Sequence, residues 1–262
     1  MLKLKRLKTI QNILIIGVGN VATHLTLGLK KTNFSVSLSG RAHEQNKKTA
    51  QQLGVDYTES ISSPGKLVDL YLIAVNDTAI TSVVEQIPSN AMICYTSGSI
   101  DLAKFSNENI GVFYPLQSFS KDRSLSLENV PFFIEAKNQE LEQQLIDLAS
   151  KLSSKVYLAD SNTRGHLHLA AVFVNNFTNH LFTLASDYLS ENGQHIEVLK
   201  PLIEETVRKL DYMSPSEAQT GPARRNDLNV IKKHKSLLEG KSAQEVYRIM
   251  SNSIINYYKE KK

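Results

Sequence analysis

The stretch Asn12-Ile13-Leu14-Ile15-Ile16-Gly17-Val18-Gly19-Asn20-Val21-Ala22 lies near the start of the chain and decides its fold. Its first part, residues 13–16, is a short apolar run that is typical of a buried parallel strand. After the two glycines, apolar residues recur every three or four positions as far as residue 29, which predicts a helix. The stretch therefore predicts a strand, a tight turn and a helix in succession.

The turn carries the pattern G-x-G-x-x-A, with Ala22 in the third small position. Between a strand and a helix, this pattern is the fingerprint of a dinucleotide-binding site. Gly17 permits the turn, and Gly19 leaves room for a pyrophosphate at the positive N-terminus of the helix. We predict that the cofactor-binding residues here are Gly17, Gly19, Asn20 and Val21. The alternative is an ordinary strand-to-helix turn in another α/β fold.

Length and composition exclude several classes of protein. The chain has 262 residues, of which 41% are hydrophobic and 21% charged, as in one large or two ordinary globular domains. The net charge of +4 is too small, and the lysines are too scattered, to predict nucleic-acid binding. No apolar window is long enough for a membrane span, and none follows the basic stretch 3–8 as in a signal peptide. A single cysteine, Cys94, excludes an internal disulfide, so we expect a cytoplasmic protein.

The end of the second predicted strand, residues 34–39, indicates which dinucleotide binds. A fold that prefers NAD usually has an acidic residue here for the ribose 2′-hydroxyl, and this chain has none. Ser39 and Arg41 instead offer a hydroxyl and a guanidinium, which suit a 2′-phosphate. We therefore predict NADP as the cofactor in preference to NAD. The alternative is that Arg41 is a solvated residue that opens the next helix.

Strands and helices alternate over the first part of the chain and then give way to helices alone. Further strands are predicted at 55–57, 68–75, 91–95, 110–114, 131–134 and 155–158, with helices at 43–53, 78–87 and 139–152. This alternation predicts an α/β fold with a doubly wound, mostly parallel Rossmann sheet. We assign it to residues 1–158. Residues 159–262 are predicted to form an all-helical substrate and dimerisation domain, with helices at 162–191, 195–212, 225–239 and 243–259.

The predicted helix 162–191 is apolar in its middle but also carries polar side chains. A helix this apolar is usually covered on all sides, which suggests a homodimer. Spacings of seven and four residues place His168, Asn175 and Asn179 on one stripe. Buried imidazoles and amides are costly without partners, so the stripe suggests a wet cleft; hydrogen bonding within a dimer core is the alternative. No metal site is predicted, because His166 and His168 point to different sides and no carboxylate lies at ligand spacing.

Ligands of a doubly wound sheet bind beyond the carboxyl ends of its strands. This rule selects Val75 and Asn76 for the cofactor, and Ser97, Gly98 and Gln117 for the substrate. Hydroxyl and backbone N–H groups in these loops could orient a substrate. The alternative is that each loop is a simple turn, since Ser, Gly and Pro are common turn residues.

The loop 219–227 provides the third group of candidate residues. Two adjacent arginines, Arg224 and Arg225, follow a turn and could clamp a carboxylate or phosphate in bidentate fashion. We predict Thr220, Arg225 and Asp227 as substrate-binding residues. The alternative is a helix that Asp227 caps, with solvated arginines before it.

Taken together, these motifs resemble a family of Rossmann-like proteins with a helical C-terminal domain of unknown function. That family is related to pyrroline-5-carboxylate reductases, ketopantoate reductases and 6-phosphogluconate dehydrogenase-like enzymes. The resemblance covers nearly the whole chain and rests on segments 17–22, 96–99, 115–119, 168–176 and 220–227. Two residues depart from the family pattern, because Tyr114 stands where a His is expected and Asn226 replaces a Gly. The resemblance implies an NADP-dependent reductase that acts on a small carbonyl or imine substrate.

One departure from the relatives concerns the proton donor. The hydroxyacid dehydrogenases among them use a Lys four residues before an Asn on the corresponding helix, and Ala171 and Val172 occupy those positions here. We therefore predict His168 as the proton donor, since imidazole titrates near neutral pH. Asn175 would orient the substrate, and Arg225 would hold an anionic end. The alternative is a non-catalytic NADP-binding sensor or scaffold, which the loss of the Lys favours.

Overall fold

The computed structural model describes residues 9–41 and 43–260, so the basic stretch 3–8 lies outside the described residues. The chain divides into two compact units, Met1–Asn175 and Asn176–Lys262. None of the helices in the described part of the chain has the length and hydrophobicity needed to cross a bilayer.

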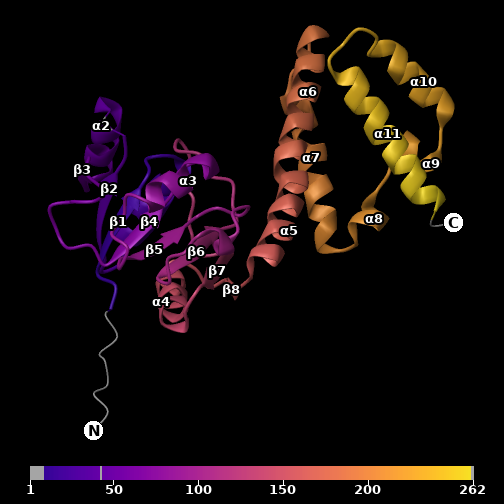
Figure 1. Ribbon diagram of the computed structural model, residues 1–262. Coiled ribbons are helices and arrows are strands. Elements are labelled where there is room, and N and C mark those ends of the chain that lie inside the picture. The colour runs from indigo at the N-terminus through magenta and orange to yellow at the C-terminus, as the bar shows by residue number, and fades with distance from the viewer. Residues whose placement is uncertain (1–8, 42, 261–262) are drawn as a thin grey trace. The chain divides into compact units, whose positions relative to one another are not determined.

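The first unit is built on an eight-stranded sheet with the order β3-β2-β1-β4-β5-β6-β7-β8 (Figure 1). Neighbouring strands are parallel except β6 and β7, so β7 and β8 run opposite to the others. The predicted doubly wound, mostly parallel sheet is confirmed. Its strands are β1 (Asn12–Ile16), β2 (Ser35–Ser39), β3 (Asp56–Thr58), β4 (Leu70–Ile73), β5 (Met92–Tyr95), β6 (Ile110–Pro115), β7 (Phe132–Ala136) and β8 (Val156–Leu158).

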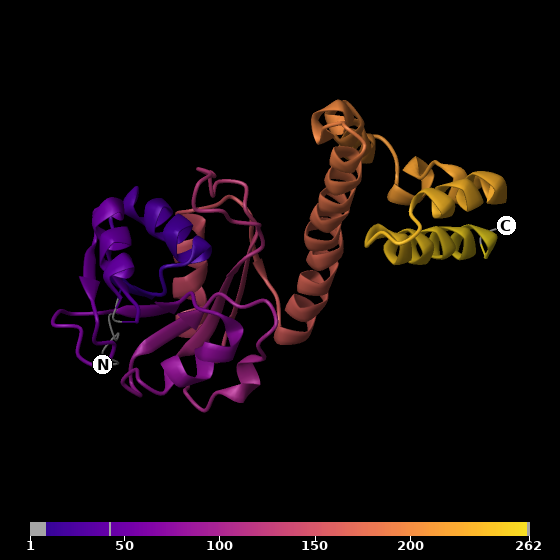
Figure 2. The same cartoon turned by 90° about the horizontal axis from the view of Figure 1, so that it is seen from above.

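Helices cover both faces of this sheet (Figure 2). Successive residues of β1 point to opposite sides, so Ile13 and Ile15 join one hydrophobic core and Leu14 and Ile16 join the other. The first core is closed by α1 (Asn20–Lys30), α2 (Glu44–Leu53) and α4 (Gln139–Ser150), and the second by α3 (Asp77–Val84) and the short 3₁₀ helix η1 (Leu102–Lys104). Burial on both faces explains why β1 and β4 are uninterrupted apolar runs.

The predicted helix 162–191 contains a change of helix type. Ser161–Ala171 is α-helical (α5), Val172–Phe177 is a π-helix (η2), and Thr178–Glu191 is α-helical again (α6). A π-helix bonds each N–H to the carbonyl five residues back instead of four, so it turns later side chains by roughly one position. The prediction that Asn175 shares a stripe with His168 is therefore wrong, because Asn175 lies inside this π-helix.

The second unit is helical, as predicted. After α6 it contains α7 (Lys200–Arg208), between the 3₁₀ helices η3 (Ile196–Leu199) and η4 (Lys209–Asp211), and then α8 (Pro215–Ala218), α9 (Pro222–Arg225), α10 (Leu228–Leu237) and α11 (Ala243–Lys259). The helix predicted from residue 225 begins later, because Asn226 adopts a left-handed conformation with φ 55° that ends α9. Asp227 then caps α10 by accepting a hydrogen bond from the N–H of Val230 (3.1 Å).

Candidate cofactor and active site

The turn after β1 requires a glycine at its first position. Gly17 has φ +123°, and a Cβ atom added there would lie 2.2 Å from the carbonyl oxygen of Ala74. Its N–H donates a hydrogen bond to the carbonyl of Ser39 (2.8 Å), which ties the turn to the end of β2. β1 therefore ends between the carboxyl ends of β2 and β4, the point at which the strand order reverses and nucleotides bind in such sheets.

The second glycine of the turn has a different role. A Cβ atom added to Gly19 would meet no heavy atom within 4 Å, so the space beside it is open. Gly19 is also the N-cap of α1, and the first backbone hydrogen bond of that helix runs from Thr23 N–H to the Gly19 carbonyl (3.0 Å). The N–H groups of Asn20, Val21 and Ala22 are thus left without intrahelical partners. An open space at a helix N-terminus with free N–H groups fits a pyrophosphate.

The predicted cofactor residues after β4 lie at the same turn. Val75 Cγ1 would be 3.4 Å from a Cβ atom on Gly17. Asn76 is exposed at the N-cap of α3, and its side chain makes no capping hydrogen bond. The structure therefore brings Val75 together with the glycine turn and leaves the Asn76 amide available to a ligand.

The two residues predicted to select NADP differ in exposure. The Ser39 side chain is fully buried, and its hydroxyl has no hydrogen-bond partner, so it does not reach a surface where a 2′-phosphate could bind. The prediction for Ser39 is therefore not supported, because strand residues alternate between the two faces and this one points into the protein. Arg41 is exposed just beyond the end of β2, and its role in binding the 2′-phosphate stays a prediction.

The loop after β5 is held in one conformation by many hydrogen bonds. The Ser97 hydroxyl accepts hydrogen bonds from the N–H groups of Ser99 and Ile100 (both 3.1 Å), and the hydroxyl of Tyr95 donates to the Ile100 carbonyl (3.2 Å). The Ser99 hydroxyl in turn donates to Asp77 at the start of α3. Ser97 was predicted to bind substrate, but in the structure its hydroxyl makes hydrogen bonds that hold the loop in shape.

Sequence reasoning missed Arg164, which fixes this loop to α5. Its side chain is fully buried, its Nε donates to the Ser97 carbonyl (3.2 Å), and its Nη2 donates to the Ile100 carbonyl. Its Nη1 forms an ion pair with Glu135 of β7. A buried guanidinium needs such partners. The sequence could have indicated this role, because Arg164 lies four residues before His168 and therefore on the same face of α5.

His168 is half-buried and lies beside Gly98. Its Nδ1 lies 3.0 Å from the hydroxyl oxygen of Tyr114, the residue that replaces the expected His. A Cβ atom on Gly98 would lie 2.9 Å from that Nδ1 and 2.7 Å from Tyr114 Cζ. Gly98 therefore lets an imidazole and a phenol close over the carboxyl ends of β5 and β6.

The other predicted active-site residues of the first unit are less constrained. Asn175 is exposed within the π-helix η2. The Gln117 side-chain oxygen accepts a hydrogen bond from the N–H of Ser118 (2.8 Å), which leaves its amide nitrogen free for a ligand. The structure does not bring either residue into contact with the Tyr114–His168 pair.

In the second unit, a basic cavity of about 770 Å³ contains two of the predicted substrate residues, Thr220 and Arg225. Arg224 and Lys259 also line it, and its lining includes no acidic residue. The Arg224 guanidinium lies 4.0 Å from the centre of the Tyr258 ring, a cation–π contact that holds it in place. Asp227 does not belong to this cavity, because its carboxylate caps α10, so its predicted role in substrate binding is not supported.

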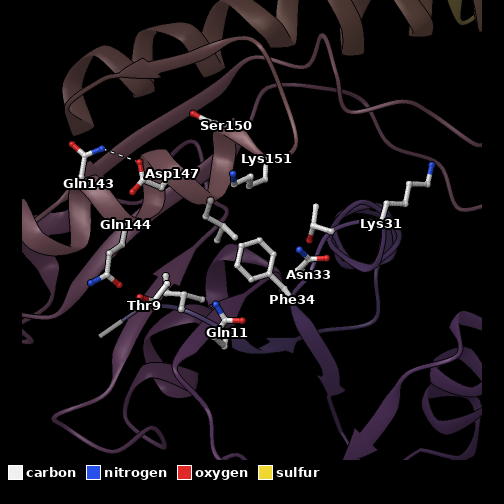
Figure 3. Close-up of a pocket in the computed structure, with 13 residues that line it drawn as sticks. Thr9, Gln11, Lys31, Asn33, Phe34, Gln143, Gln144, Asp147, Ser150 and Lys151 are labelled. Atoms are coloured by element: carbon white, nitrogen blue, oxygen red, sulfur yellow. Dashed lines mark hydrogen bonds between the residues drawn. The ribbon is translucent and has the colours of Figure 1, made fainter. Parts of the chain in front are cut away.

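A cavity of about 800 Å³ lies at the opposite end of the sheet from the glycine turn (Figure 3). Residues 9–11 and 31–34, which precede β1 and β2, line it together with α4, and Phe34 lies in its middle. Ligands of doubly wound sheets bind at the carboxyl ends of the strands. This cavity lies at their amino ends and is therefore not assigned to the cofactor. Among the described residues there is also no group of three or more His, Cys, Asp or Glu side chains placed to hold a metal ion.

Comparisons with known proteins identify relatives of both parts of the chain. Residues 12–93 match the family model of NADP oxidoreductases that are coenzyme F420-dependent, and residues 130–254 match a domain of unknown function, DUF2520. A candidate NADP oxidoreductase from Bacteroides fragilis is 38% identical, with 94% of this chain and 98% of that chain covered and a TM-score of 0.87. The comparison with curated proteins gives no match.

Two more distant structures share the fold alone. One is a reductive aminase from Aspergillus terreus in complex with NADPH and ethyl-5-oxohexanoate (14% identity, 96% of this chain and 94% of that chain, TM-score 0.73). The other is a 1-pyrroline-5-carboxylate reductase from Streptococcus pyogenes (18% identity, 95% and 98%, TM-score 0.62).

Proposed function

The chain belongs to the NADP oxidoreductase family of its Bacteroides fragilis relative, and we propose that it is an NADPH-dependent reductase of a small carbonyl or imine compound. The observation that carries this proposal is the place of His168. Its imidazole lies beside Gly98, at the carboxyl ends of the parallel strands, where a doubly wound sheet binds its cofactor and substrate.

Different residues of the first unit would bind the cofactor, orient the substrate and donate the proton in such a reaction. The glycine turn and the free N–H groups at the start of α1 would bind the pyrophosphate, and Arg41 would bind the 2′-phosphate. When bound, NADPH supplies the hydride. His168 would donate the proton, while Asn175, Gln117 and the backbone at Gly98 would orient the substrate.

The basic cavity of the second unit suits a negatively charged group. As predicted substrate-binding residues, Thr220 and Arg225 would bind such a group within this cavity, and the cation–π contact with Tyr258 would hold Arg224 in place beside them. The group bound would be a carboxylate or a phosphate. Because proteins of similar fold include a reductive aminase and a 1-pyrroline-5-carboxylate reductase, imines are candidate substrates to be tested beside carbonyl compounds.

We further propose a cytoplasmic homodimer, in which residues 159–262 contribute to substrate binding and to dimerisation. Leu169 and Val174, on the long helical segment 161–191, are 56% and 75% exposed. Large apolar side chains gathered on one segment favour a covering partner, and a second copy of the chain is the partner that the sequence predicts.

The experiment that tests the enzyme proposal measures NADPH oxidation with a panel of keto acids, aldehydes and cyclic imines. His168→Ala should lower turnover about 10²–10⁴-fold, the usual contribution of a general acid. NADPH affinity should stay unchanged, because the imidazole acts on the substrate. His166→Ala is the matched control, since His166 is exposed two residues earlier on the same helix. NADPH binding without turnover of any panel member would instead favour a sensor.

A further inference from the structure

Tyr114 and His168 form a pair that is built into the fold. The Tyr114 hydroxyl oxygen lies 3.0 Å from His168 Nδ1, and the two rings meet edge to face with their centres 6.1 Å apart. Tyr114 is buried in β6, where it belongs to the hydrophobic core that also contains Tyr95 and Phe105. The phenol is therefore fixed by the sheet, and the imidazole is fixed against the phenol.

The surroundings of the pair leave little freedom for either ring. The backbone at Gly98 packs against both, since a Cβ atom there would lie 2.9 Å from both Tyr114 Oη and His168 Nδ1. Arg164, one helical turn before His168, binds the carbonyls on both sides of Gly98 and pairs with Glu135. The helix that carries His168 is thus locked to the loop on which the pair rests.

The contact assigns different roles to the two nitrogens of His168. Nδ1 faces the Tyr114 hydroxyl, and no bond to Nε2 is found among the described residues. A protonated imidazole donates through both nitrogens. Its Nδ1–H would donate to the Tyr114 oxygen, which leaves Nε2–H for a substrate.

We propose that Tyr114 is a positioning residue, whose hydroxyl holds His168 through Nδ1 so that Nε2 delivers the proton. This inference rests on the proposed reductase function. In the step, the Nε2–H bond breaks and the proton bonds to the carbonyl oxygen or imine nitrogen of the substrate, as the hydride from NADPH adds to the adjacent carbon. The imidazolium becomes a neutral imidazole that keeps its Nδ1–H bond to Tyr114, and a proton from water then restores Nε2–H.

Tyr114 stays neutral beside the imidazole. Burial raises the pKa of Tyr114 to about 12, with the nearby Arg164 charge opposing the shift. The phenol therefore keeps its proton at neutral pH and acts as a neutral hydrogen-bond partner of the imidazole.

The kinetic test compares Tyr114→Phe with the unmodified enzyme. Loss of a hydrogen bond to a charged group should lower kcat roughly ten- to a hundredfold, with KM and NADPH affinity unchanged. In a His168→Ala background the same substitution should change kcat less than twofold, because its partner is gone. Tyr157→Phe is the matched control, since Tyr157 is a half-exposed tyrosine on β8. An unchanged kcat in Tyr114→Phe, or an equal loss in the His168→Ala background, would overturn the proposal.

A second readout needs no substrate and separates this inference from the proposed function. At mildly acid pH, a ¹H–¹⁵N correlation spectrum of the ¹⁵N-histidine-labelled protein should show an Nδ1–H resonance of His168 that the hydrogen bond protects from exchange with water. It should disappear in both Tyr114→Phe and His168→Ala. A resonance that persists in Tyr114→Phe would refute the positioning role even if the protein is a reductase. A protected resonance without turnover on the panel would support the contact and count against the reductase.

Discussion

Arg164 and Glu135 form an ion pair that joins α5 to β7, and the guanidinium is fully buried. The same guanidinium binds the carbonyls of Ser97 and Ile100, and the Ser161 hydroxyl donates to the Glu135 carboxylate (2.9 and 3.0 Å). A strand near the edge of the sheet, the start of a helix and the loop after β5 therefore meet at one buried charge.

Removal of this charge should destabilise the protein strongly. Arg164→Ala leaves Glu135 and two backbone carbonyls without their partner, at an expected cost of about 3–5 kcal/mol in the free energy of unfolding. Urea denaturation measures this cost. Lys66→Ala is the control, because it breaks an exposed pair with Asp56 and should leave the free energy of unfolding nearly unchanged. Equal losses in the two variants would contradict the structural role of Arg164.

The two glycines of the nucleotide turn should respond in opposite ways to a methyl group. Gly17→Ala forces a Cβ atom against the Ala74 carbonyl at a positive φ, so it should lower stability by more than about 2 kcal/mol. Gly19→Ala adds a methyl group to open space, so it should change stability by less than about 1 kcal/mol. It should nevertheless weaken NADPH binding at least about tenfold, because the methyl group occupies the proposed pyrophosphate site. Unfolding curves measure the change in stability, and fluorescence titration measures the change in NADPH affinity. Tight NADPH binding by Gly19→Ala would show that the pyrophosphate does not bind beside Gly19.

Arg41 and Ser39 give a matched test of the choice between NADPH and NADH. Arg41→Ala should reduce the difference between the binding free energies of NADPH and NADH by about 1–3 kcal/mol, the value of a hydrogen bond to a charged group. Ser39→Ala should leave the difference unchanged, because the Ser39 hydroxyl is buried and has no partner. Titration with both cofactors measures the difference, and equal affinities in the unmodified protein would show that Arg41 does not select NADP.

The sequence predicted most of this fold because periodicity reports burial directly. An apolar run such as 13–16 indicates a strand covered on both faces, and β1 is such a strand. The helix 162–191 was predicted without its π-helix, since a π-helix depends on which backbone groups pair and leaves no simple trace in composition.

The candidate site was harder to predict than the fold. His168 was chosen as the proton donor because the Lys of the relatives is absent and an imidazole can exchange a proton near neutral pH. In the structure it lies beside Gly98. Arg164 was missed, because an arginine at the start of a helix usually faces solvent. Its burial depends on the carbonyls of Ser97 and Ile100 and on Glu135, which only the folded chain brings together.

Tyr114 should make stability depend on pH in the alkaline range. Burial raises the pKa of Tyr114 from 10.0 to about 12, so the unfolded chain loses this proton at a lower pH than the folded chain does. The contribution of Tyr114 to stability is therefore complete below pH 10 and is lost as the pH rises toward 12. Urea unfolding between pH 8 and 11 should show a steeper loss of stability for the unmodified protein than for Tyr114→Phe. Parallel curves would mean that the phenol ionises equally well in both states.

The proposed dimer can be tested by placing a charge on the long helical segment. Val174 is 75% exposed, and an apolar residue at such a position stabilises a dimer only if a second chain covers it. The unmodified protein should sediment at about twice 29.3 kDa at micromolar concentration, and Val174→Asp should shift it toward the monomer by burying an unpaired carboxylate at the interface. Leu67→Asp is the control, because Leu67 is 65% exposed in a loop of the first unit and should leave the mass unchanged. A dimer that persists in Val174→Asp but is lost in Leu67→Asp would show that the interface involves the loop around Leu67. Monomers for the unmodified protein and both variants would show that no second chain covers the long helical segment.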